Sequence, residues 1–288
     1  MKISIVGCGE VGRCYARAFD KAGFTVSVLC DERPSEATNA LAETLGARQE
    51  PALGAWLADA DLVISAVFGG VSLEVASQAL PHMKKGALYA DLTTADPDHM
   101  RAAAELAKAN GIRFVDVAIT GAIVMSGAAT PLLCAGEGAD SVAQLLTQTG
   151  APIKVVGTQA GDAATLKLLR SIFTKGVEAL AVECLVAAEK KGLRSELYDV
   201  LSDIDQASLT QFLESCVRSH VVHAARRLAE VREAKRQLRK DSLDPLVLDG
   251  VESLFERTAM ALERDNPTVQ NTIEASLAWL GEQAKTKS

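Results

Sequence analysis

Short apolar runs alternate with longer stretches of helical periodicity through the first half of the chain. The runs predict buried β-strands, because they are brief, rich in β-branched residues and bounded by glycine or polar residues. Strands are expected at Ile3–Gly7, Thr25–Cys30, Leu62–Val67, Ala87–Asp91, Arg113–Val117, Leu132–Ala135 and Ile153–Val156. Capped helices are expected between them at Val11–Ala22, at Glu36–Leu45 and from Asp96-Pro97 to Asn110-Gly111. This alternation predicts a doubly wound α/β sheet of parallel strands.

Beyond Val156 only helical periodicity remains. One helix of roughly 43 Å, at 1.5 Å per residue, is expected from Ala163 to Lys191, with Gly176 interrupting its pattern. Further helices are expected at Ser202–Arg218 and His220–Lys240, and after the capping pairs Asp244-Pro245 and Asn266-Pro267. The chain is therefore predicted to have an α/β domain over residues 1–160 and an all-α domain over residues 161–288, built on the long interdomain helix.

A glycine-rich turn links the first strand to the first helix: Gly7-Cys8-Gly9-Glu10-Val11-Gly12. In such a turn the first glycine permits a sharp bend, the second leaves room for a pyrophosphate and the third lets the helix pack closely. The helix start adds unpaired N–H groups and a positive dipole end. The strand–turn–helix context favours a Rossmann domain that binds a dinucleotide through these residues. A tight turn without a ligand is the alternative.

The second strand is followed by Asp31, about 20 residues beyond the turn, where dinucleotide-binding domains carry an acid for the ribose hydroxyls. Its carboxylate repels a 2′-phosphate, because two unit charges about 4 Å apart cost roughly 4 kcal/mol at an effective dielectric near 20. Arg33 argues in the other direction, since a guanidinium can pair with a phosphate. We expect NAD as the cofactor, with NADP as the alternative.

Composition narrows the function further. The chain has 288 residues, is 48% apolar and carries a net charge of −7, so it can form a core and lacks the basic balance of a nucleic-acid-binding protein. No apolar stretch approaches the roughly 20 residues of a membrane span, and no signal peptide is expected. The six cysteines lack zinc-site spacing, so we expect no metal and a reduced, cytoplasmic protein.

Three later stretches carry a family resemblance: Asp91-Leu92-Thr93-Thr94-Ala95-Asp96-Pro97, Asp116-Val117-Ala118-Ile119-Thr120-Gly121-Ala122, and Gly161 through Lys167 to Ser171. Together with the glycine turn they resemble motifs of the β-hydroxyacid dehydrogenases. That superfamily includes 3-hydroxyisobutyrate dehydrogenase and, more distantly, 6-phosphogluconate dehydrogenase. The second half of the chain is similar to a subgroup whose helical C-terminal domain has no assigned function.

The resemblance implies that Lys167 is the catalytic residue. The expected cofactor contacts are Gly7, Cys8, Gly9, Glu10, Val11, Gly12, Asp31, Arg33, Ala66, Val67, Phe68 and Thr93. The expected substrate contacts are Thr94, Thr120, Gly121, Ala122 and Ser171. His223, on a charged helix face with Arg226, is a further candidate for an anionic substrate. A solvated face with ion pairs to Glu230 and Glu233 is the alternative there.

The chain departs from the family pattern at several of these positions. Thr93 and Thr120 stand for serines, Ala118 for proline, Ala122 for glycine, Pro131 for leucine and Ser171 for an asparagine. Cys30-Asp31 replaces an Asn-Arg pair whose arginine serves NADP, and the glycine before Lys167 is six residues away instead of four. These differences predict an altered substrate pocket.

A lysine suits hydride transfer at an alcohol carbon, because its amine takes the hydroxyl proton in oxidation and its ammonium returns it in reduction. Burial beside a nicotinamide would lower the pKa of Lys167 towards neutrality. A lysine stem lying along an apolar surface is the alternative. Lys175, on nearly the same helix face, is a second candidate.

The expected function is that of an NAD(P)-dependent oxidoreductase acting on a small hydroxyacid, or on its keto or semialdehyde form. Oxidative decarboxylation of a sugar acid, imine reduction and NAD(P) sensing without turnover are alternatives, and Lys167 argues against imine reduction. An apolar stripe on the long helix predicts a homodimer. The stripe comprises Leu166, Leu169, Phe173, Val177, Leu180 and Cys184.

Overall fold

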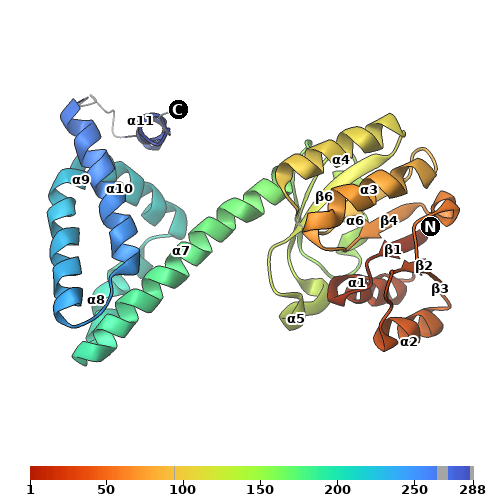
Figure 1. The fold of residues 1–288 in the computed structure, drawn as a ribbon, viewed down its shortest axis with the longest axis horizontal. Coiled ribbons are helices and arrows are strands. Elements are labelled where there is room, and N and C mark those ends of the chain that lie inside the picture. The colour runs from red at the N-terminus through yellow and green to blue at the C-terminus, as the bar shows by residue number, and fades with distance from the viewer. Residues whose placement is uncertain (94, 265–271, 286–288) are drawn as a thin grey trace. The chain divides into compact units, whose positions relative to one another are not determined.

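The chain folds into two compact units, Met1–Ile172 and Phe173–Ser288, in a computed structural model (Figure 1). The structure describes residues 1–93, 95–264 and 272–285. The first unit contains a sheet covered by helices, and the second is helical. The expected α/β class with a helical C-terminal region is confirmed.

The first unit contains an eight-stranded sheet in the order β3-β2-β1-β4-β5-β6-β7-β8. Its strands are β1 Lys2–Val6, β2 Thr25–Cys30, β3 Arg48–Glu50, β4 Leu62–Ser65, β5 Leu88–Asp91, β6 Arg113–Ile119, β7 Leu132–Ala135 and β8 Ile153–Gly157. The strand order reverses between β1 and β4. In sheets of this type ligands bind at such a switch point, beyond the carboxyl ends of the strands.

Two features of the sheet correct the sequence-based prediction. β7 runs antiparallel to β6, although all strands were expected to be parallel. The connection between them, residues 120–131, holds only the one-turn helix α5, Ile123–Ser126, and a short 3-10 turn, so the chain does not cross back along the sheet. β3 was not expected, because Arg48-Gln49-Glu50 is polar; it pairs only with β2 at the sheet edge.

Helices cover both faces of the sheet. α1 Glu10–Lys21, α2 Glu36–Leu45 and α6 Ala139–Thr147 bury apolar side chains against one face. α3 Ser72–Ala79 and α4 Pro97–Ala109 cover the other face (Figure 1). Alternate strand residues divide between the two cores, as Ile3 and Ile5 face α1 while Val63 and Tyr89 face α4. Short 3-10 turns occur at Ala55–Asp59, Gly69–Val71, Leu80–His82, Gly127–Ala129 and Ser202–Gln206.

The remaining helices are α7 Asp162–Lys191, α8 Arg194–Leu201, α9 Leu209–Lys240, α10 Leu246–Arg264 and α11 Ile273–Gln283. α7 is continuous through Gly176, so the expected single helix over Ala163–Lys191 is confirmed although the glycine interrupts its residue pattern. α9 is also a single helix where two stretches were expected. It starts with a reciprocal cap between Ser208 and Gln211, and no glycine or proline breaks it. The expected helix start at Asn266-Pro267 lies outside the described residues.

α9 and α10 pack side by side in the second unit through polar and aromatic contacts. Lys235 is buried on α9 and forms ion pairs with Asp249 and Glu252 of α10. His220 donates to or accepts from Thr258 at 2.9 Å, and its ring meets Phe255 edge-on. None of the helices in the described part of the chain has the length and hydropathy to cross a membrane.

Candidate active site

The glycine turn between β1 and α1 has the geometry of a dinucleotide-binding loop. Gly7 has a φ of +86°, and a side chain there would press on the Ala66 carbonyl oxygen at 2.7 Å. A side chain at Gly12 would collide with the Gly7 carbonyl oxygen. Gly9 differs, because a Cβ at this position would meet no protein atom within 4 Å. Protein packing therefore explains two of the glycines, and open space lies in front of the third.

The start of α1 is prepared for an anion. Gly9 is the N-cap residue, and no side chain in the described part of the chain caps the first N–H groups of the helix. These groups and the helix dipole together favour a phosphate at this position. The open space at Gly9 and the uncapped helix start fit the pyrophosphate of a dinucleotide.

Asp31 connects the end of β2 to the turn. One carboxylate oxygen accepts the Cys8 N–H at 2.8 Å, and the other accepts the Arg33 N–H at 2.9 Å. Each oxygen keeps a lone pair with which to accept a ribose hydroxyl. Arg33 is exposed and forms no ion pair with any other described residue. The predicted acid therefore lies against the predicted turn.

Cys8 is held inside the same turn. Its side chain is buried, and its thiol donates to the Cys30 carbonyl oxygen at 3.6 Å. Burial, and next the Asp31 carboxylate, raise the pKa of Cys8 to about 12. Cys8 is therefore a neutral packing residue whose backbone N–H, rather than its sulfur, faces the acid.

The end of β4 borders the turn. Ala66 and Val67 supply the nearest atoms to a Cβ built on Gly7, so residues 66 and 67 lie directly against the glycine loop. Phe68 follows and is 89% exposed. An exposed aromatic ring beside a nucleotide loop can cover an adenine or ribose face.

Two threonines follow the ends of the central strands β5 and β6. Thr93 directs both its N–H and its hydroxyl to Asp91, at 2.8 and 2.5 Å. Thr120 directs its N–H and its hydroxyl to the Pro131 carbonyl oxygen, at 3.0 and 2.9 Å. Both hydroxyls thus keep acceptor capacity. Thr94, expected to contact substrate, lies outside the described residues.

The loop after β6 exposes small and apolar groups. Gly121 and Ala122 are exposed, and a Cβ on Gly121 would lie 2.9 Å from the Thr130 side chain. On α5, Val124 and Met125 are 80% and 86% exposed. These two apolar side chains were not singled out in the sequence, because nothing local to Ile123–Ser126 distinguishes an exposed apolar turn from a buried one.

The start of α7 is fixed to β6 by Asp116. One oxygen of this buried carboxylate accepts the N–H groups of Gly161 at 3.0 Å and Ala164 at 2.9 Å. Gly161 has a φ of +94°, and a side chain there would lie 2.8 Å from the Pro97 carbonyl oxygen on α4. The glycine therefore allows α7 to begin close to α4 and above β6.

Lys167 lies one turn beyond this anchor and is half-buried. Burial lowers the pKa of its ammonium below the ordinary value; the Asp116 carboxylate opposes this shift and Arg170 adds to it. Ser171 lies one turn further along α7 and is also partly buried. Burial thus makes Lys167 less basic than an ordinary lysine, which is the direction that favours proton transfer near neutral pH.

Lys175 and His223 have different surroundings. Lys175 is exposed and forms an ion pair with Glu178 at 2.7 Å. His223 is exposed on α9 in the second unit, beside Arg226, which pairs with Glu230. Both side chains lie in ordinary exposed surroundings on a helix surface. Contact of His223 with substrate stays a prediction.

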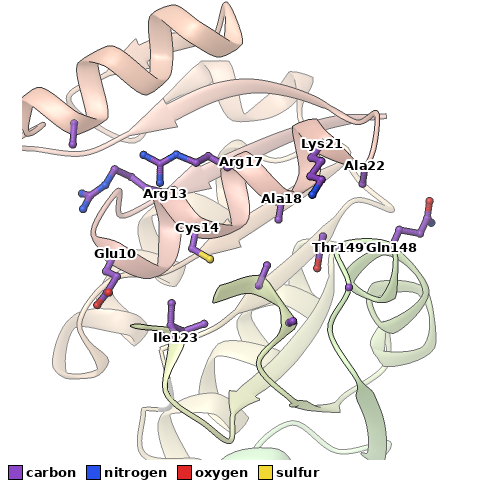
Figure 2. Close-up of a pocket in the computed structure, with 14 residues that line it drawn as sticks. Glu10, Arg13, Cys14, Arg17, Ala18, Lys21, Ala22, Ile123, Gln148 and Thr149 are labelled. Atoms are coloured by element: carbon purple, nitrogen blue, oxygen red, sulfur yellow. The ribbon is translucent and has the colours of Figure 1, made fainter. Parts of the chain in front are cut away.

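A groove of about 860 Å³ runs along α1 beside the turn (Figure 2). Figure 2 shows Arg13, Arg17 and Lys21 on the helix side, with Ile123 opposite. Arg13 donates to the Cys8 carbonyl oxygen at 2.6 Å, which ties the groove wall to the turn. Across residues 1–93, 95–264 and 272–285, no three His, Cys, Asp or Glu side chains gather in a way that could hold a metal ion.

A glycine turn after β1, an acid at the end of β2 and a switch point beside them define a nicotinamide-dinucleotide-binding domain of the dehydrogenase and reductase class. The chain belongs to the family described as the NAD binding domain of 6-phosphogluconate dehydrogenase, whose model matches residues 2–157. A second family model, a domain of unknown function (DUF1932), matches residues 188–258. Both halves of the resemblance seen in the sequence are confirmed.

Individual relatives extend over nearly the whole chain. An uncharacterized 28.5 kDa protein in the 7S RNA 5′ region of Methanothermus fervidus is 29% identical over 257 residues, covering 89% of this chain and 98% of that protein. A solved structure reported to resemble 3-hydroxyacid dehydrogenases is 30% identical, covers 91% of this chain and 98% of its own, and has a TM-score of 0.64.

An imine reductase from Aspergillus terreus, solved with NADPH4 and dibenz[c,e]azepine, has a TM-score of 0.75 at 24% identity. The match covers 90% of this chain and 94% of that one. At this identity the likeness concerns the fold alone.

Proposed function

We propose that the chain catalyses hydride transfer between a nicotinamide cofactor and a small hydroxyacid, or its keto or semialdehyde form, with Lys167 as the general acid and base. The observation that carries this proposal is the half-buried Lys167, whose pKa is lowered by burial one turn after the Asp116-anchored start of α7. The bound nicotinamide supplies or accepts the hydride.

The lysine accounts for the proton that accompanies the hydride. In the reducing direction its ammonium hydrogen-bonds to the carbonyl oxygen and protonates it as negative charge develops. In the oxidising direction the neutral amine accepts the hydroxyl proton. Thr120, Gly121 and Ala122 follow β6, the strand that anchors α7, and we assign them to the substrate carboxylate. The backbone N–H groups of the exposed residues Gly121 and Ala122 suit an anion, whereas the Thr120 N–H and hydroxyl donate to Pro131.

A substrate panel tests the proposal. Small hydroxyacids, their keto or semialdehyde forms, sugar acids and cyclic imines are each offered with NAD or NADP, and nicotinamide absorbance and carbon dioxide release are followed. We expect turnover with a hydroxyacid pair and no carbon dioxide. Turnover of imines alone would assign C=N reduction instead. Cofactor binding with no turnover of any compound would favour a sensor.

Cofactor choice is expected to depend on Asp31. Asp31→Asn keeps an oxygen to accept the Cys8 N–H but removes the negative charge that faces a 2′-phosphate. We expect the ratio of NADP to NAD affinity to rise at least tenfold, equivalent to about 1.4 kcal/mol. Titration of both cofactors by fluorescence measures the ratio. Asp20→Asn, an exposed acid on α1, is the matched control and should leave the ratio unchanged; an unchanged ratio in Asp31→Asn would contradict the assignment.

We also propose that the chain forms a homodimer. The stripe on α7 is exposed in the single chain, with Val177 and Leu180 each 47% exposed, which a second copy would cover. Light scattering is expected to give twice the chain mass of 30.4 kDa. A double variant, Val177→Lys with Leu180→Lys, should be monomeric, whereas Val200→Lys, on exposed α8, should remain dimeric. A monomeric wild-type protein would rule out the dimer.

A further inference from the structure

Three buried polar side chains form a row across the centre of the sheet. Ser65 of β4 is in register with Asp91 of β5, and Asp91 is in register with Asp116 of β6. The three residues are 0%, 1% and 0% exposed. Each lies two residues after a strand residue whose side chain packs in the core beneath α4, namely Val63, Tyr89 and Phe114. Because strand side chains alternate between the two faces, all three point to the face that carries α4 and the start of α7.

Hydrogen bonds satisfy only half of this row. In Asp91, one oxygen accepts the Thr93 N–H and hydroxyl; in Asp116, one oxygen accepts the Gly161 and Ala164 N–H groups. The other oxygen of each carboxyl is buried without a partner among the described residues, as are the hydroxyls of Ser65 and of Tyr89 on β5. Each of two neighbouring acids thus has one buried oxygen without a donor, and a proton between the two carboxyls would supply one.

It is energetically costly for two adjacent buried carboxyls both to be charged. Burial raises the pKa of Asp91 to about 6, and the Asp116 charge adds to that rise. Burial also raises the pKa of Asp116 to about 6, against the opposing effect of its backbone hydrogen bonds. One proton placed between them turns one carboxyl into a donor and leaves the other as its acceptor.

Other charged and titratable groups near Ser65, Asp91 and Asp116 lie on α7, β5 and α4. On α7, Asp162 disfavours charge on Asp116, and Lys167 lies within the influence of the Asp116 charge. On β5, the buried Tyr89 has its pKa raised above the ordinary range by burial and then by Asp91, so it stays neutral. On α4, Arg101 pairs with the exposed Asp98.

We propose that Asp91 and Asp116 hold one proton between them that ordinary carboxyls would release, and that the charge of Asp116 keeps Lys167 in its ammonium form. Asp116 is then a positioning residue: it anchors the start of α7 and sets the charge beside the lysine. The proton moves only between carboxyl oxygens, so no other reactant takes part. The importance of the Asp116 charge for Lys167 rests on the proposed function, because that function makes Lys167 the catalytic residue. The proton shared by Asp91 and Asp116 is independent of the proposed function.

The shared proton should make the free energy of unfolding depend on pH. The pair's pKa values are raised in the folded state, so the folded protein binds more protons than the unfolded chain between about pH 4 and 6. The contribution of the pair to stability is full below the unfolded value and is lost as the pH rises through about 6. Asp91→Asn should flatten this fall, because its amide can donate permanently to the free oxygen of Asp116.

Infrared spectroscopy tests the shared proton without any turnover. Wild-type protein at pH 5 should show a protonated-carboxyl band that disappears above pH 7. Asp91→Asn and Asp116→Asn should each remove the whole band, since either amide replaces the shared proton as donor. Asp98→Asn, an exposed acid on α4, should leave it. Loss of only half the band in each variant, or no band in the wild type, would overturn the proposal.

Titration of Lys167 tests the second clause. The ε-methylene signal is followed by NMR in carbon-labelled protein and assigned by its loss in Lys167→Met. Asp116→Asn should move the midpoint down by at least about half a pH unit, a threefold change in proton affinity, whereas Asp91→Asn should not lower it. An unmoved midpoint in folded Asp116→Asn would refute the link even if Lys167 proves catalytic. A moved midpoint with an inessential Lys167 would instead refute the proposed function.

Discussion

Lys167→Met is expected to lower kcat by about 100- to 10,000-fold, the usual range for loss of a positioned general acid or base. Methionine retains the unbranched stem that packs along half-buried α7 but cannot carry a proton. Cofactor affinity should stay within about threefold of the wild type, because the glycine turn and Asp31 lie on other elements. Steady-state kinetics with the best substrate of the panel, together with cofactor titration, measures both.

Lys175→Met is the matched control for this prediction. It removes the same chemical group from the same helix, but Lys175 is exposed and paired with Glu178. Its activity is expected to equal that of the wild type. If Lys175→Met loses turnover while Lys167→Met keeps it, Lys175 is the catalytic lysine instead of Lys167.

Gly9→Val is expected to weaken cofactor binding at least tenfold, or by about 1.4 kcal/mol, while the protein keeps its fold. A side chain at this position meets no protein atom, so the fold has no reason to reject it. The same side chain would occupy the space in front of the uncapped α1 start, where the pyrophosphate is expected. Calorimetric titration with NAD gives the affinity, and thermal unfolding gives the stability.

Gly250→Val on α10 provides the comparison, since this glycine also has open space around it but lies in the second unit. It should bind NAD as the wild type does. Unaltered binding in Gly9→Val would mean that no ligand approaches the turn, and that the glycines serve only to join β1 to α1.

The sequence was most informative where local chemistry decides the structure. β2 at Thr25–Cys30, α2 at Glu36–Leu45 and β7 at Leu132–Ala135 begin and end at the expected residues, because apolar runs and glycine caps mark them. The direction of β7 was not predictable in the same way. It depends on how residues 120–131 turn back, and no side chain in that stretch encodes the choice.

Some residues of the candidate site could likewise be recognised from the sequence, and others only from the folded structure. The glycine turn and Asp31 could be recognised because backbone geometry demands those residue types at those places. The place of Asp116 could not, since its partner Gly161 lies 45 residues away and its alignment with Asp91 exists only once β5 and β6 are in register. The sequence indicated that these acids belong to motifs, whereas only the folded structure shows that Asp91 accepts from Thr93 and that Asp116 accepts from Gly161 and Ala164.

The seclusion of Cys8 decides where thiol reagents can act on this protein. A thiol with a pKa of about 12 yields almost no thiolate at neutral pH, and Cys30 and Cys134 are in the same condition. Cys184 on α7 and Cys216 on α9 are exposed. Cys14 on α1 is partly buried, and burial raises its pKa as well. An electrophilic dye or spin label will therefore attach first to the helical unit, so native protein can be tagged there before the thiols near the nucleotide loop react.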